Sequence, residues 1–172
     1  MRFKKIITLV IFIVISKTII AQSEKDSFID TRIKKLLDSK NVNYSITKNG
    51  DFKINLITQE APKERTQRIY IYSKKESYRD FEILNIESVG FKIPKNSIKT
   101  PVLIDLLKKN GTIKIGAWSM YEYNSDPDNY SFSFEIKVAN NISAEELVTL
   151  FNFVGFQADE KEKLWGNGLD EN

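Results

Sequence analysis

The stretch NYSFSFEIKV, residues 129–138, alternates apolar and polar side chains almost without exception. Successive side chains of a β-strand point to opposite faces of the sheet, so this period of two predicts a strand with one apolar face. Either helices of the same chain or a partner must cover that face. The apolar row consists of Tyr130, Phe132, Phe134, Ile136 and Val138.

Two amphipathic segments of the chain can cover this row. Ser143 and Glu146 form a capping box that opens a long helix running towards Trp165. A first helix, beginning near residue 28 and ending at Asn41, carries a second apolar stripe. We therefore expect the row to be core. The two stripes contain Leu147, Phe151, Val154, Ala158 and Trp165 in the last helix, and Ile29, Ile33 and Leu36 or Leu37 in the first.

The segments between these helices predict further strands joined by short turns. Asn49-Gly50 is typical of a tight hairpin turn, between strands at residues 42–46 and 52–56. Thr100-Pro101 opens a short middle helix, which Asn110-Gly111 closes. Other strands are expected at residues 68–73, 78–86 (continuing to 93 through a bulge at 88–90) and 113–123, with a turn at 126–129.

This order of elements predicts an α+β fold. It has an antiparallel β-sheet of about five to six strands, with the N-terminal and C-terminal helices packed on one face and a short middle helix. Residues 28–165 form one domain, 22–27 a linker and 166–172 a flexible tail.

The N-terminus has the layout of a signal peptide. Basic residues precede an apolar run at residues 6–15, and Ala21 precedes a polar stretch. We expect residues 1–21 to be cleaved before Gln22, which makes the protein periplasmic or secreted. An uncleaved segment at residues 6–20, tethering a structural protein to the membrane, is the alternative.

Charge and composition exclude several functions. Four of the 26 Lys and Arg residues, and none of the 23 Asp and Glu residues, lie in residues 1–21, so the rest of the chain is close to neutral. Such a chain lacks the clustered positive charge that nucleic acids require. It has no Cys and no His, which excludes disulfides, zinc-finger sites and a Ser-His-Asp triad. We expect no cofactor, no structural metal and no enzymatic activity.

Carboxylates suggest two weaker alternatives. Asn124, Asp126 and Asp128, with Glu135 at the twelfth position, copy part of a calcium loop, but Asn129 replaces the required glycine, so a turn is favoured. Weak calcium binding by this acidic turn is kept as an alternative. A small periplasmic hydrolase would use paired carboxylates, for which the candidates are Glu122, Asp126, Asp128, Asp159 and Glu160.

Two surfaces are candidates for binding a protein partner or a second copy. Apolar and aromatic residues on the second sheet face suit a contact surface, unless a loop or helix covers them. The middle helix is apolar over more than half its circumference, which favours self-association, unless it is buried on two sides. The sheet-face residues are Tyr70, Tyr72, Leu84, Ile86 and Trp118, and the helix residues are Val102, Leu103, Leu106 and Leu107.

The second half of the chain resembles the YbjN-like bacterial family. The matching segments are LLKKNGTIKIGAWSM (106–120), YSFSFEIKV (130–138) and ISAEELVTLFNFVGFQADEKEKLW (142–165). That family shares the fold of class I type III secretion chaperones. The resemblance implies a non-enzymatic, dimer-forming domain that binds proteins and acts as a regulator. Relatives work in the cytosol, whereas this chain carries an export signal, so the fold carries over more readily than the role.

Overall fold

The computed structural model describes residues 28–60 and 63–166. The expected signal peptide, the linker and all but the first residue of the expected tail lie outside the described residues. No helix within the described ranges is long and apolar enough to cross a bilayer. The elements are α2 (Thr31–Ser39), β1 (Ser45–Ile46), β2 (Phe52–Gln59), β3 (Arg65–Ile71), β4 (Glu76–Tyr78), β5 (Phe81–Pro94), the 3-10 helix η1 (Lys95–Ser97), α3 (Thr100–Asn110), β6 (Ala117–Tyr123), β7 (Asp126–Ala139) and α4 (Ala144–Trp165).

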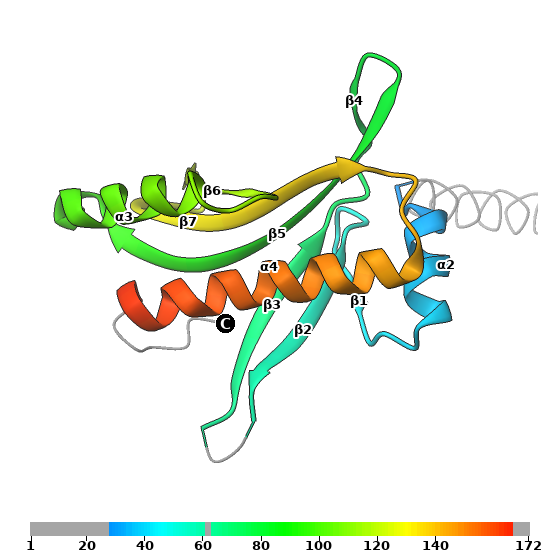
Figure 1. The fold of residues 1–172 in the computed structure, drawn as a ribbon, viewed down its shortest axis with the longest axis horizontal. Helices are drawn as coiled ribbons and strands as arrows, with labels where there is room; N and C mark the ends of the chain where they lie inside the picture. Colours follow the sequence, from blue (N-terminus) through cyan, green and yellow to red (C-terminus); the bar gives the residue numbers. More distant parts are fainter. Residues whose placement is uncertain (1–27, 61–62, 167–172) are drawn as a thin grey trace, which may run out of the picture.

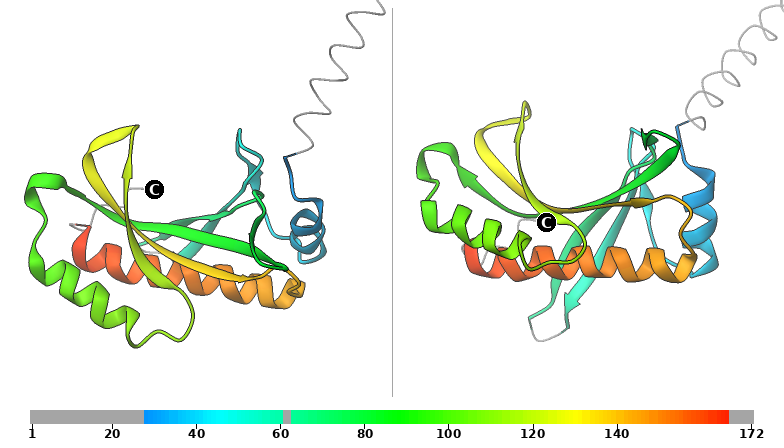
Figure 2. Two further views of the ribbon diagram at one scale, coloured as in Figure 1. Left: turned by 90° about the horizontal axis from the view of Figure 1, so that it is seen from above. Right: turned by 45° about the horizontal axis from the view of Figure 1, so that its top comes forward.

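The strands of the described residues form one antiparallel sheet, which confirms the α+β prediction. Its order is β1-β2-β3-β5-β7-β6, and the short strand β4 pairs with β5 beside this path. Helix α4 runs along one face of the sheet, with α2 near one end and α3 near the other (Figures 1 and 2). Among the helices of the described residues, none crosses the opposite face (Figures 1 and 2).

The apolar row of β7 is covered from within the chain, as predicted. Phe132, Phe134 and Ile136 are buried. They belong to one core with residues of α4 and α2, among them Phe151 and Leu37. Asp30 caps α2 by accepting hydrogen bonds from two backbone N–H groups, and the capping box of Ser143 and Glu146 opens α4 as predicted.

A β-bulge at Gly90 shifts the side chains of β5 by one position, and this confirms the predicted bulge. Before it, Ser88 pairs with Phe134 on the core face; after it, Phe91 pairs with Phe132 on the same face. Along the part of β5 next to the bulge, even-numbered side chains therefore face the core before it and odd-numbered ones after it. A Cβ atom on Gly90 would lie 2.7 Å from the Trp118 ring.

One predicted turn is wider than expected, and another is shifted along the chain. The first lies where it was predicted, because Ile46 pairs with Phe52 across Asn49-Gly50. The strand before Asn49-Gly50 is only two residues long, and the chain turns through a wider loop in which Thr47 N–H donates to the Asp51 carbonyl at 2.8 Å. The turn predicted at residues 126–129 is shifted to residues 124–125, because Tyr123 already pairs with Asp126. Pro127 cannot donate to the ladder, and it falls in the register irregularity that follows this pair.

The strand predicted at residues 113–123 begins later, at Ala117. Gly116 precedes it with φ +85°, and a Cβ atom there would lie 2.6 Å from the Glu135 carbonyl oxygen. This close approach brings the chain from α3 onto β7.

Buried ionic groups anchor α4 to the sheet. Arg65 of β3 donates to Asp159 and Glu162 of α4, each at 2.7 Å. The buried Gln67 also donates to Glu162, and Lys163 pairs with Asp159 at 2.6 Å. Burial works to raise the pKa of Asp159, but the hydrogen bonds with Arg65 and Lys163 outweigh it, so its pKa lies below the ordinary value.

Candidate functional site: the open face of the sheet

The face of the sheet opposite α4 carries a row of polar and aromatic side chains. Ile69 and Ile71 of β3 point into the core, so Tyr70 and Tyr72 point to the open face. Tyr70 pairs with Glu87 on β5, and Glu87 in turn pairs with Glu135 on β7. A tyrosine and two glutamates thus lie side by side across three strands.

A cavity of about 390 Å³ opens on this face. Strand β3 pairs with β5 over only three residues, and the two strands then diverge (Figure 1). The cavity lies beside this short pairing, and its lining comes from the β1–β2 loop, β3, β5, β6, β7, the turn between β6 and β7, and α4. The lining includes Thr47, Asp51, Arg68, Tyr70, Tyr72, Glu87, Lys92, Tyr123, Asp126, Ser131 and Glu162.

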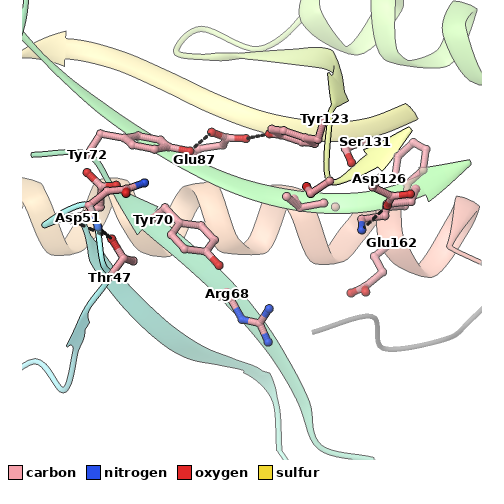
Figure 3. A pocket seen from close by; sticks show the side chains of 16 residues that line it. Thr47, Asp51, Arg68, Tyr70, Tyr72, Glu87, Tyr123, Asp126, Ser131 and Glu162 are labelled. Carbon is pink, nitrogen blue, oxygen red and sulfur yellow. Dashed lines mark hydrogen bonds and ion pairs between the residues drawn. The ribbon is translucent and has the colours of Figure 1, made fainter. Parts of the chain in front are cut away.

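Glu87 lies at the base of the cavity and is only 5% exposed. The Tyr72 hydroxyl donates to one of its carboxylate oxygens at 2.5 Å, and the Tyr123 hydroxyl lies 3.5 Å from the other. Figure 3 shows the two tyrosines approaching Glu87 from opposite sides. The carboxylate is therefore held in place by two neutral donors.

Burial and the charge of Glu87 keep both hydroxyls protonated. Burial, followed by the charge of Glu87, raises the pKa of Tyr72 well above its usual range. The same two causes raise the pKa of Tyr123 to about 12. At neutral pH both side chains are hydrogen-bond donors.

An ion pair stands at the rim of the cavity. Lys92 of β5 donates to Asp126 of β7 at 2.8 Å. This hydrogen bond, and a second one from Asn129, lower the pKa of Asp126. The charge of Lys92 is therefore balanced locally and is not directed at Glu87.

Of the five residues predicted for the partner face, the structure places two on the open face and three in the core. Tyr70 and Tyr72 line the cavity. Leu84 and Ile86 were placed on the wrong face: they pair with Val138 and Ile136 and share the core side of β7. At 2% and 0% exposure they cannot form a contact surface. The sequence of β5 is apolar on both sides, because Phe81 and Ile83 alternate with Leu84 and Ile86.

Trp118 also belongs to the core. It pairs with Phe134, and its ring lies 5.7 Å from that phenyl ring and 6.0 Å from Phe91. The sequence left the face of this strand ambiguous, since both sides are apolar. The register of β6 against β7 places the Trp118 side chain on the core face.

The middle helix is partly buried, which corrects the predicted self-association surface. Val102 and Leu106 are core residues, and Leu103 packs against the core. Leu107, in contrast, is 70% exposed, and Ile104 beside it is half exposed. The available apolar surface on α3 is therefore narrower than the four residues predicted.

Four of the five carboxylates considered for hydrolysis are held in ion pairs, and the fifth, Asp128, is exposed in β7. Glu122 pairs with Lys95, Asp126 with Lys92, and Glu160 with Lys109. Asp159 belongs to the anchor of α4. In the part of the chain that the structure describes, no group of three acidic side chains is placed to hold a metal ion.

Glu87 and Tyr123 also line the cavity, and the predicted partner face did not include them. Glu135, which lies across from Glu87, was considered only as part of a calcium loop. One signal for Glu87 was present in the sequence: it is a charged residue in the middle of an apolar strand, and lone charges are rarely buried without a reason. Tyr123 reaches the cavity only through the β6–β7 turn, whose position was predicted wrongly.

Comparisons with known proteins give a likeness of fold. No protein-family model matches the chain, and no curated protein matches it. Among the solved structures that match is the crystal structure of YbjN from E. coli, a proposed transcription regulator. The match has a TM-score of 0.45 and 8% sequence identity, and it covers 76% of this chain and 90% of that chain.

Proposed function

We propose that this protein is an exported, non-enzymatic domain that binds another protein through the open face of its sheet. One observation carries the proposal: the helices of the described residues lie on one face of the sheet (Figures 1 and 2), while a cavity lined by three tyrosines opens on the other. Tyrosine combines an apolar ring with a polar tip, and it is enriched in protein interfaces for this reason.

Export is supported by the N-terminal sequence alone. A basic start, an apolar run and Ala21 before a polar stretch are typical of a cleaved signal peptide. Mass spectrometry of the protein from the cell envelope and from the medium tests this. We expect a mature N-terminus at Gln22, whereas a chain that keeps Met1 in the membrane fraction would favour a tethered protein.

Binding through the open face is tested by replacing Tyr70 and Tyr72 with serine. The tagged wild-type protein and the double variant are used to capture partners from an envelope extract, which are quantified by mass spectrometry. We expect the variant to lose at least one partner that the wild type captures, while its melting temperature stays within a few degrees of the wild type. The control is Phe156→Ser, a half-exposed aromatic residue on α4.

Two capture results, and one melting result, would contradict this proposal. One is identical capture by the wild type and the double variant. The other is loss of the same partner in the Phe156→Ser control, which would place the contact on the helical side. A collapse of the melting temperature would show that the two tyrosines serve the core.

A carboxylate-dependent hydrolase is the second candidate, because Glu87 and Glu135 are direct cross-strand neighbours. Residues in such positions have Cβ atoms about 4.5–5.5 Å apart, and paired carboxylates can cleave glycosides. A panel of glycan, ester and peptide substrates tests this activity. Turnover that Glu87→Gln abolishes would favour the hydrolase over the binding domain.

A further inference from the structure

The carboxylate of Glu87 is buried, and no cationic side chain in the described part of the chain pairs with it. Its two hydrogen-bond donors are tyrosine hydroxyls, which are neutral. A buried charge is costly to maintain unless an opposite charge compensates it. Hydrogen bonds from neutral groups offset only part of that cost.

A second carboxylate makes this cost larger. Glu135 lies directly across from Glu87 in the register of β5 and β7, and it accepts a hydrogen bond from the Ser119 hydroxyl at 2.7 Å. Like charges in directly opposite positions on one sheet face repel. Among the ion pairs within residues 28–60 and 63–166, none includes Glu87 or Glu135.

The cations near the cavity are directed elsewhere. Lys92 is paired with Asp126, and Lys137 pairs with Glu76 at 3.7 Å. Arg68 lines the cavity, but its guanidinium group lies beyond Tyr70 and points away from Glu87 (Figure 3). The structure thus presents a negative charge at the base of a cavity, and no side chain of the described residues forms an ion pair with it.

The walls of the cavity suit a cation as well. Tyr72 and Tyr123 flank the carboxylate, and Tyr70 lies beside them (Figure 3). The faces of aromatic rings attract ammonium and guanidinium groups, and the attraction grows when water is excluded. A carboxylate with surrounding tyrosines combines both interactions in one place.

We propose that this cavity binds a lysine or arginine side chain of the protein partner, with its positive charge against Glu87. The proposal rests on the open face being a protein-binding site, and it names the chemical group that the site recognises. The aliphatic stem of the side chain would lie among the tyrosine rings. Ion pairing would then relieve the repulsion between Glu87 and Glu135.

The test uses isothermal calorimetry with short peptides of glycine that carry one central residue. The central residue is lysine, arginine, or norleucine, which has an uncharged side chain close to lysine in length. We expect the lysine or the arginine peptide to bind at least tenfold more tightly than the norleucine peptide. Glu87→Gln should remove this preference, and Glu160→Gln, on the exposed side of α4, should leave it unchanged.

A second measurement separates recognition from folding. Because Glu87→Gln removes a buried charge that has no cationic partner, the free variant should melt at the same temperature as the wild type or higher. Loss of affinity together with unchanged or raised stability is the signature of a binding residue. A lower melting temperature would show that Glu87 serves the fold and would overturn the proposal.

The affinities of the peptides and of butylamine, and the capture of partners, also test the proposal. Equal affinity for the norleucine and lysine peptides, or no binding of any peptide at millimolar concentration, would overturn the proposal. If butylamine binds as tightly as the lysine peptide, the ligand is a free amine. That result would contradict the proposal that the cavity binds a side chain of a protein partner. If Tyr70 and Tyr72 variants lose the captured partner while Glu87→Gln retains it, the open face remains a binding site and only the cation assignment fails.

Discussion

At Gly90, the hydrogen atom that stands in place of a side chain faces the indole ring of Trp118. This residue is at the bulge of β5 and also lines the cavity. The bulge lets one strand carry Ile86 and Phe91 into the same core, although they are an odd number of positions apart. It also turns Glu87 and Lys92 to the open face. One residue without a Cβ atom therefore sets which side chains reach the site.

We predict that Gly90→Ala destabilises the protein. The new Cβ atom would lie 2.7 Å from the Trp118 ring and 3.1 Å from the Ala158 carbonyl oxygen, so the indole or α4 must move. Overpacking of this kind costs about 1–3 kcal/mol of the free energy of unfolding. Chemical denaturation measures it.

The control is Gly111→Ala. Gly111 ends α3 with φ −69°, and the nearest atom to its Cβ would be at 3.4 Å. That substitution should be neutral or stabilising, by up to about 1 kcal/mol, because it restricts the unfolded chain. A Gly90→Ala variant as stable as Gly111→Ala would show that the bulge tolerates a side chain.

At the scale of elements, α4 is attached to the sheet by charges as well as by apolar contacts. Its N-terminal half packs Leu147, Phe151 and Val154 into the core, whereas its C-terminal half places Asp159 and Glu162 against Arg65. The two halves therefore respond differently to pH.

We predict that Asp159 makes the stability of the protein depend on acid pH. Its pKa is lower in the folded than in the unfolded state, so its contribution is complete above the ordinary aspartate pKa. The contribution is lost as pH falls through the folded-state pKa. Asp159→Asn should cost about 2 kcal/mol at neutral pH and flatten the acid side of the stability curve.

The measurement is the free energy of unfolding between neutral and acid pH for three proteins. The third is Asp128→Asn, whose carboxylate is exposed in β7. It should follow the wild-type curve throughout. Parallel curves for Asp159→Asn and the wild type would show that the anchor of α4 does not depend on this charge.

At the scale of the whole molecule, self-association through α3 stays a prediction. Leu107 and Ile104 are its exposed apolar residues, and both lie away from the cavity lining. We expect light scattering at micromolar concentration to find a dimer of the wild type and a monomer of Leu107→Asp. Ile57→Asp, at another exposed apolar position, in β2, should leave the dimer intact. A monomeric wild type contradicts the prediction.

Patterns that are regular over many residues predicted the fold correctly. The alternation of residues 130–138 and the capping box at Ser143 depend on local chemistry, and the structure has both. The placement of Leu84 and Ile86 failed because β5 is apolar on both sides, and only pairing with β7 decides which side is core. Tyr70 and Tyr72 were placed on the open face because Ile69 and Ile71 are clearly apolar. The neighbours Glu87 and Tyr123 come from other strands, so only the register brings them together.

The long pairing between β5 and β7 has a consequence for the order in which the chain can fold. Residues 83–94 pair with residues 129–139, but α3 and β6 lie between them in the sequence. A growing chain therefore completes β5 well before its neighbour exists, and one edge of β5 keeps its backbone groups unpaired. A chain that ends after residue 123 contains every strand except β7, yet both β5 and β6 have lost the strand between them. Such a truncated chain should aggregate through these edges instead of forming a smaller sheet.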